Sequence, residues 1–84
     1  MAGKYAPLEK YLRDLPVAQK EETLTLAEIQ EILEGELPPS AHTDRAWWGN
    51  QKPGMQVEMI PWMDAGWLVE HVDFHENRVR FVRQ

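Results

Sequence analysis

Cysteine is missing from this chain of 84 residues. Disulfide bridges, thiolate nucleophiles and cysteine-ligated zinc sites are therefore excluded, and the composition suits a reducing compartment. Long apolar runs are also missing, so the sequence predicts neither a signal peptide nor a membrane-spanning segment. We expect a cytoplasmic protein that forms one domain over residues 1–84, because a chain of this length buries a single core.

Motifs for catalysis and metal binding are lacking as well. Neither the GxGxxG nor the P-loop pattern occurs, and Ser40 has no GxSxG context. Among the three histidines, His71 and His75 would lie on one strand face. They would be about 13 Å apart, which is too far to share one metal ion. We expect no enzymatic activity, no metal site and no cofactor.

Positive charge is scarce and unevenly placed. Nine Lys and Arg face fourteen Asp and Glu, which gives a net charge of −5 and counts against nucleic-acid binding by bulk charge. The segment Glu21–Glu36 is rich in glutamate and contains no Lys or Arg. The segment Arg78–Gln84 contains three arginines and no acid. One face is therefore expected to be basic although the whole chain is acidic.

Two stretches of the N-terminal half have helical periodicity. In residues 6–15, a proline suits the first turn and apolar residues recur every three or four positions. In residues 25–35, Thr25 and Glu28 predict a capping box at the start of a second helix. Gly35 is placed to provide its left-handed C-terminal cap.

Shorter elements are expected around these helices. The stretch TLT, residues 23–25, is β-branched at both ends and predicts a brief strand. Ser40 is expected to cap a short helical turn that runs to Arg45. A short helix is expected around Pro61 to Ala65, ending at Gly66.

The C-terminal segment alternates apolar and polar residues and predicts a β-hairpin with a two-residue turn at Glu76 and Asn77. Its four central apolar residues are expected to be buried, with Arg78 and Arg80 on the opposite face. The register that follows pairs Phe74 with Val79, Val72 with Phe81, Asp73 with Arg80, and Glu70 with Arg83.

These elements predict an α+β fold. Helices would pack on a short antiparallel sheet, in which the early strand joins the C-terminal hairpin. The element order is like that of a winged helix. Because many small α+β domains share this order, it does not fix the function.

The adjacent tryptophans Trp47 and Trp48 have two interpretations. In the structural one, one ring fills the core, Arg45 stacks on the other, and Asn50 hydrogen-bonds the following turn. In the functional one, an outward ring joins nearby cations to form a platform for base stacking and phosphate contacts. The predicted nucleic-acid-binding residues are Arg45, Trp47, Trp48, Asn50, Lys52, Arg78 and Arg80.

The stretches KYAPLEKYL, LTLAEIQEILEGELPPSA, RAWWGN, AGWLVEHVDF and VRFVR together resemble a small, uncharacterised prokaryotic or phage family with no assigned function. The chain departs from the family pattern at Glu34, before Gly35, and in a longer, proline-rich segment at residues 51–61. The positions that the resemblance marks are Ser40, Arg45, Trp47, Trp48, Asn50, Ala65, Gly66 and Trp67.

We therefore expect a small non-enzymatic module that associates with DNA or RNA or has a regulatory role. The alternative is a protein-interaction or inhibitor module, related to phage or defence, that uses the glutamate-rich helix or the tryptophan pair. No membrane partner is expected. A nucleic-acid binder should carry Arg45, Arg78 and Arg80 on one positive surface, whereas an inhibitor of a basic protein should be acidic there.

Overall fold

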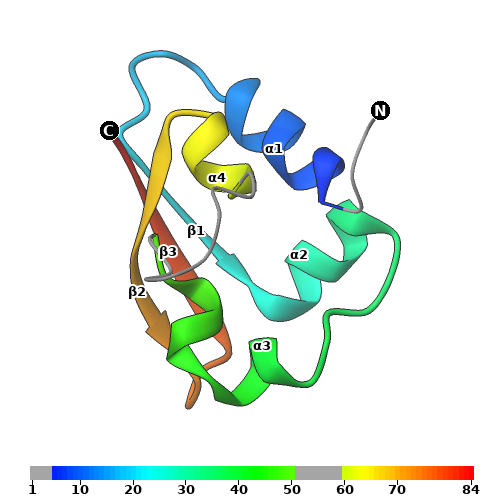
Figure 1. Ribbon diagram of the computed structural model, residues 1–84. Helices are drawn as coiled ribbons and strands as arrows, with labels where there is room; N and C mark the ends of the chain where they lie inside the picture. The colour runs from blue at the N-terminus through cyan, green and yellow to red at the C-terminus, as the bar shows by residue number, and fades with distance from the viewer. Residues whose placement is uncertain (1–4, 51–59) are drawn as a thin grey trace.

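The fold is α+β, as predicted, in a computed structural model that describes residues 5–50 and 60–84. In Figure 1 the three strands lie along one side of the molecule, and α1, α2 and α4 gather on the other. The elements in chain order are α1 (Ala6–Arg13), β1 (Glu21–Thr25), α2 (Leu26–Leu33), α3 (Ser40–Thr43), the 3₁₀ helix η1 (Arg45–Trp48), α4 (Pro61–Asp64), β2 (Trp67–Asp73) and β3 (Arg78–Arg83).

The start of α2 is set by the predicted capping box. The backbone N–H of Glu28 donates to Thr25 Oγ1 at 3.0 Å, and the backbone N–H of Thr25 donates to Glu28 Oε1 at 2.8 Å. The predicted cap at the other end is wrong. The helix ends at Leu33, so Glu34 and not Gly35 takes the left-handed cap conformation, with φ of 56°.

The short elements between α2 and β2 follow the sequence only in part. Ser40 is the first residue of α3 and Pro39 precedes it as N-cap, so the prediction that Ser40 caps this turn is wrong. Gly66 closes α4 with φ of 89°, a conformation that suits glycine, as predicted. The order of helices and strands is winged-helix-like, but α3, η1 and α4 have four residues each where a winged helix has a long recognition helix.

The sheet has the order β1-β3-β2 and is antiparallel throughout. The early strand therefore joins the hairpin, as predicted. Alternation along the strands sends Leu24, Val72, Val79 and Phe81 to the buried face. Trp67 lies on the same face, and its Nε1 donates to the backbone oxygen of Leu12 at 3.0 Å, which ties β2 to α1.

The predicted hairpin register is wrong. Val72 pairs with Val79 and Asp73 with Arg78, and a bulge at Glu70 shifts the register before His71. The loop holds four residues and not two, because the Asp73 carboxylate accepts hydrogen bonds from the two backbone N–H groups of residues 75 and 76. Consequently, Phe74 lies in the loop and is only partly buried, while Val72, Val79 and Phe81 are buried as predicted.

Candidate functional site

The tryptophan pair belongs to an aromatic cluster under the sheet. Trp48 is 1% exposed, and its Nε1 donates to the backbone oxygen of Ala41 at 2.8 Å. Its ring stacks on Trp62 with centroids 5.6 Å apart. Trp47 is half-buried and lies edge-on to Trp48 at 4.7 Å and to Tyr5 at 5.8 Å. Both rings are packed against other aromatic side chains, and Trp48 fills the core as the structural interpretation predicts for one ring of the pair.

The residues that flank the pair fasten it to β2. Asn50 Nδ2 donates to the backbone oxygen of Val69, and Asn50 Oδ1 accepts from the backbone N–H of Val69, both at 2.8 Å. The same Oδ1 accepts from Trp62 Nε1 at 3.0 Å. Arg45 donates to the backbone oxygen of Val72 and lies 5.4 Å from the centre of the Phe74 ring. Asn50 and Arg45 thus bond to β2, and the predicted bond of Asn50 to the following turn falls on residues 51–59, outside the described part.

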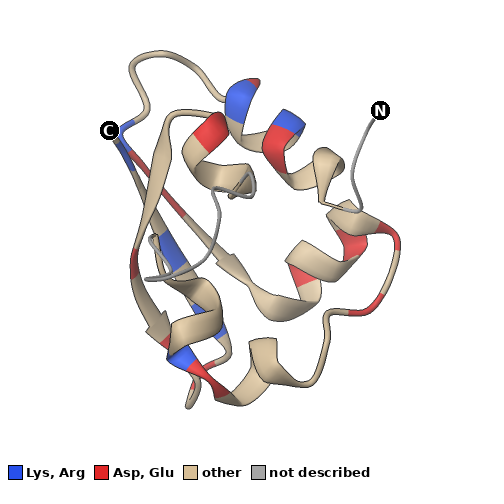
Figure 2. Ribbon diagram, viewed as in Figure 1, with Lys and Arg blue, Asp and Glu red and all other residues tan. Residues whose placement is uncertain are grey.

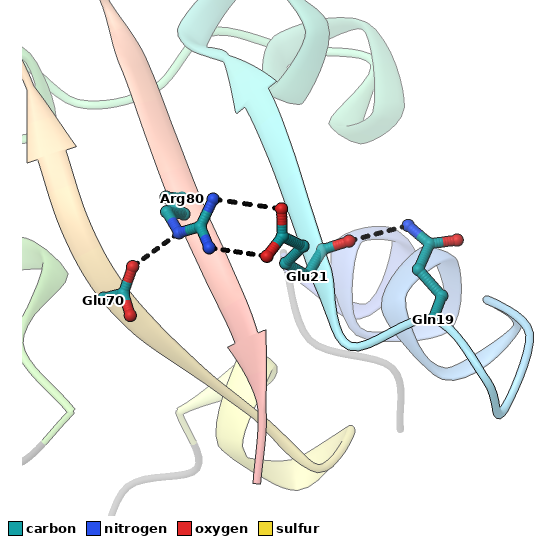
Figure 3. A network of polar contacts seen from close by, with 4 residues as sticks. All are labelled: Gln19, Glu21, Glu70 and Arg80. Carbon is teal, nitrogen blue, oxygen red and sulfur yellow. Dashed lines mark hydrogen bonds and ion pairs between the residues drawn. The ribbon is translucent and has the colours of Figure 1, made fainter.

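Arg80 lies at the centre of an ion-pair network on the outer face of the sheet (Figure 3). Its guanidinium contacts Glu70 at 2.5 Å from β2 and Glu21 at 2.6 Å from β1. The hydrogen bonds to Glu21 and then to Glu70 raise the pKa of Arg80. The predicted partner Asp73 lies instead opposite Arg78, whose own ion pair is with Glu76 at 3.5 Å. Arg80 is therefore already neutralised by two carboxylates.

The structure places the tryptophan pair and two arginines of β3, Arg78 and Arg80, on opposite sides of the sheet. The tryptophans lie among the residues that fill the space between the sheet and the helices, whereas Arg78 and Arg80 alternate with buried Val79 and point to the other face. Lys52 lies outside the described residues. Nucleic-acid binding stays a prediction that this geometry does not test.

Every other Lys or Arg that the structure describes also has an oxygen partner within the chain. Lys10 pairs with Asp14 at 2.6 Å and Arg13 pairs with Glu9 at 2.8 Å. Lys20 donates to a backbone oxygen at 3.5 Å. Arg83 donates to two backbone oxygens at 2.8 and 2.9 Å and lies 4.5 Å from the centre of a tryptophan ring. The described cations are thus committed to contacts inside the molecule.

Whereas the described cations have oxygen partners, the glutamates of α2 and of the loop after it form no ion pairs with described residues. We call Glu28, Glu31, Glu34 and Glu36 the acidic ridge; all four are exposed. Within residues 5–50 and 60–84, none of the four forms an ion pair. Figure 2 shows acidic positions along this part of the ribbon with no basic position between them. The ridge is a concentration of negative charge that the described chain does not neutralise.

One carboxylate near the ridge is partly sequestered. The Tyr11 hydroxyl donates to Glu22 Oε2, and Gln19 Nε2 donates to Glu22 Oε1 at 3.0 Å. The hydrogen bond to Glu22, followed by burial, raises the pKa of Tyr11 to about 12. This contact fastens β1 to α1.

Metal binding and membrane crossing find no support in the described residues. No group of three or more His, Asp or Glu side chains in them is arranged to hold a metal ion. None of the helices in residues 5–50 and 60–84 is long and apolar enough to cross a membrane.

Sequence reasoning missed Glu21 as the partner of Arg80, and Asn50 as a link between β2 and α4. The contrast between the acidic segment and the arginine-rich C-terminus was the signal that could have indicated the ion pair of Glu21 and Arg80. No comparable signal marks Asn50, because its partners are mainly backbone groups 19 residues away in sequence.

The chain belongs to the family described as Domain of unknown function (DUF7662), whose model matches residues 5–84. The predicted membership of an uncharacterised family is confirmed. No curated protein and no solved structure matches the chain.

Proposed function

We propose that this member of the DUF7662 family is a non-enzymatic module that binds a positively charged segment of a partner protein through its acidic ridge. The observation that carries the proposal is the asymmetry in charge pairing. The described cations contact oxygens of the same chain, whereas the glutamates of the ridge form no ion pair with any described residue.

This asymmetry makes binding of a cation at the ridge less costly than binding of a phosphate at Arg80. Arg80 would have to leave two carboxylates before it could bind a phosphate, and both bonds are charge-assisted. The carboxylates of Glu31, Glu34 and Glu36 of the ridge have no hydrogen bond or ion pair to a described residue, so a Lys or Arg that approaches them displaces water. A net charge of −5 also steers cationic partners toward the protein and repels nucleic acid.

The test compares two variants that remove the same charge from different places. Binding is measured by fluorescence anisotropy with an oligolysine peptide, an oligoglutamate peptide, single-stranded DNA, duplex DNA and RNA, at low and at raised salt. The ridge variant carries Glu31→Gln, Glu34→Gln and Glu36→Gln, and the control variant carries Asp14→Asn, Asp64→Asn and Glu76→Gln.

We expect the natural chain and the control variant to bind the oligolysine peptide, with affinity that falls as salt rises. The ridge variant should bind at least tenfold more weakly, which corresponds to about 1.4 kcal/mol. Equal weakening in both variants would mean that only net charge matters and would contradict a localised site. Salt-dependent binding to DNA or RNA, reduced by Arg45→Gln or Arg78→Gln, would favour the nucleic-acid function instead.

A further inference from the structure

The outer edge of β1 exposes backbone hydrogen-bonding groups. The N–H of Arg83 donates to the oxygen of Lys20, and the N–H of Leu26 donates to the oxygen of Asn77, both at 2.8 Å. These two bonds fix the antiparallel pattern, because paired and outward-facing residues alternate along a strand. Glu21, Thr23 and Thr25 therefore direct their N–H and C=O groups away from β3.

Among the described residues, side chains close the two ends of this edge and leave its middle uncovered. Gln19 Nε2 donates to the backbone oxygen of Glu21 at 3.0 Å, as Figure 3 shows. At the other end, Glu28 Oε1 accepts from the N–H of Thr25 at 2.8 Å. Within the described part of the chain, no side chain or neighbouring strand hydrogen-bonds the outward groups of Thr23, and its side chain is exposed.

Unpaired negative charge lies at one end of the same edge. The Glu21 carboxylate is bound to Arg80 and the Glu22 carboxylate to Tyr11 and Gln19, but β1 runs directly into α2, which carries the start of the acidic ridge. An added strand at this edge would therefore pass carboxylates at that end, and opposite charges on neighbouring strands stabilise pairing.

We propose that the partner segment binds as an extended strand, rich in Lys or Arg, that pairs with β1 at Thr23. This inference rests on the proposed function and adds the mode of recognition. Backbone hydrogen bonds to Thr23 give the attachment, and cations on the added strand face the acidic ridge. The opposite edge of the sheet does not offer this site, because Asn50 bonds both outward groups of Val69 and Arg45 bonds the outward oxygen of Val72.

The experiment selects ligands from a phage-displayed library of random peptides and measures their binding to variants of β1. Thr23→Pro removes the outward N–H, and proline is tolerated at sheet edges. Thr23→Val keeps the backbone groups and is the matched control. Circular dichroism and melting temperature establish that both variants are folded.

We expect the selection to enrich peptides that combine Lys or Arg with β-branched residues. Their binding should weaken about tenfold in Thr23→Pro, as loss of a strand hydrogen bond and a steric block require, and stay within about twofold in Thr23→Val. A second readout needs no variant. The Thr23 amide should exchange its hydrogen rapidly in the free protein and become protected when a selected peptide binds.

Three outcomes would overturn strand addition: no enriched peptide, equal binding to Thr23→Pro and the natural chain, or a Thr23 amide that stays unprotected in the complex. Failure of this inference is distinguishable from failure of the proposed function. Basic peptides that lose affinity for the ridge variant but not for Thr23→Pro would support the function and exclude pairing with β1. Peptides that lose affinity only for Thr23→Pro would support pairing and contradict the ridge.

Discussion

The two outer strands of the sheet differ in how their free edges are covered. On β2, Asn50 hydrogen-bonds both backbone groups of Val69 and Arg45 bonds the oxygen of Val72, so side chains occupy the positions that another strand would take. On β1, Gln19 and Glu28 bond only the two ends. No described residue hydrogen-bonds the outward backbone groups of Thr23 between them.

Exposed strand edges invite pairing with other chains, and proteins commonly protect them with charge, bulges or covering segments. Here β2 has a covering segment and a bulge at Glu70, whereas β1 is short and flanked by glutamates. A short acidic edge discourages pairing with another copy of this acidic chain. It remains open to a segment of opposite charge, which is the selectivity that the proposed function requires.

The largest loss of stability is expected when the side chain that covers the edge of β2, Asn50, is removed. Asn50→Ala removes three hydrogen bonds, two to Val69 and one to Trp62, and should lower the free energy of unfolding by about 3 kcal/mol. Urea denaturation measures the change. Thr23→Ala, on the uncovered edge, is the control and should change stability by less than about 0.5 kcal/mol. Equal losses in the two variants would contradict the difference between the edges.

The next effect is at the end of β1. Glu28→Ala removes the side chain that accepts from the N–H of Thr25 and should lower the free energy of unfolding by about 1 kcal/mol. Glu28→Gln keeps an oxygen acceptor and should be nearly neutral. Thermal unfolding followed by circular dichroism distinguishes the two. A loss in Glu28→Gln as large as in Glu28→Ala would attribute the effect to charge and not to capping.

Tyr11 gives a pH-dependent effect on the inner side of β1. Its pKa is raised from 10.0 to about 12, so its contribution to stability is fully present below pH 10 and is lost as the pH rises toward 12. Tyr11→Phe should be less stable by about 0.8 kcal/mol at neutral pH, with the difference vanishing in that alkaline range. Denaturation series at several pH values measure it, and a difference that persists above pH 12 would contradict the assignment.

The smallest effect on stability is expected at Gln19. Gln19→Ala releases the backbone oxygen of Glu21 and should lower the free energy of unfolding by about 0.5 kcal/mol. Because this lengthens the uncovered edge, selected basic peptides should bind more tightly to the variant. Isothermal titration calorimetry measures the affinity. Weaker binding would show that Gln19 supports the ligand and does not compete with it.

Local sequence signals predicted much of the fold. The capping box of Thr25 and Glu28 fixed the start of α2 correctly, because both partners are three residues apart and no distant contact intervenes. Alternation predicted that Val72, Val79 and Phe81 are buried. The hairpin register was wrong since the bulge at Glu70 and the four-residue loop depend on how the strand meets its neighbours, and alternation does not report an inserted residue.

The candidate site was predictable only in outline. The contrast of charge between the segments containing Glu21 and Arg80 is visible in the sequence, but their ion pair requires knowing that β1 lies beside β3. Likewise, no residue near Thr23 in sequence indicates that its backbone faces outward. That property depends on the register of β1 against β3, which is a long-range feature.

The edge of β1 at Thr23 is also the place where aggregation of the protein is expected to begin. Near neutral pH the net negative charge makes copies of the protein repel one another, so the edge of β1 does not pair with a second copy. As the pH falls toward the isoelectric point of about 5.1, that repulsion disappears, and colloidal stability is lowest. Aggregation under mildly acidic storage should therefore begin with strands that pair at β1, and Thr23→Pro should delay it.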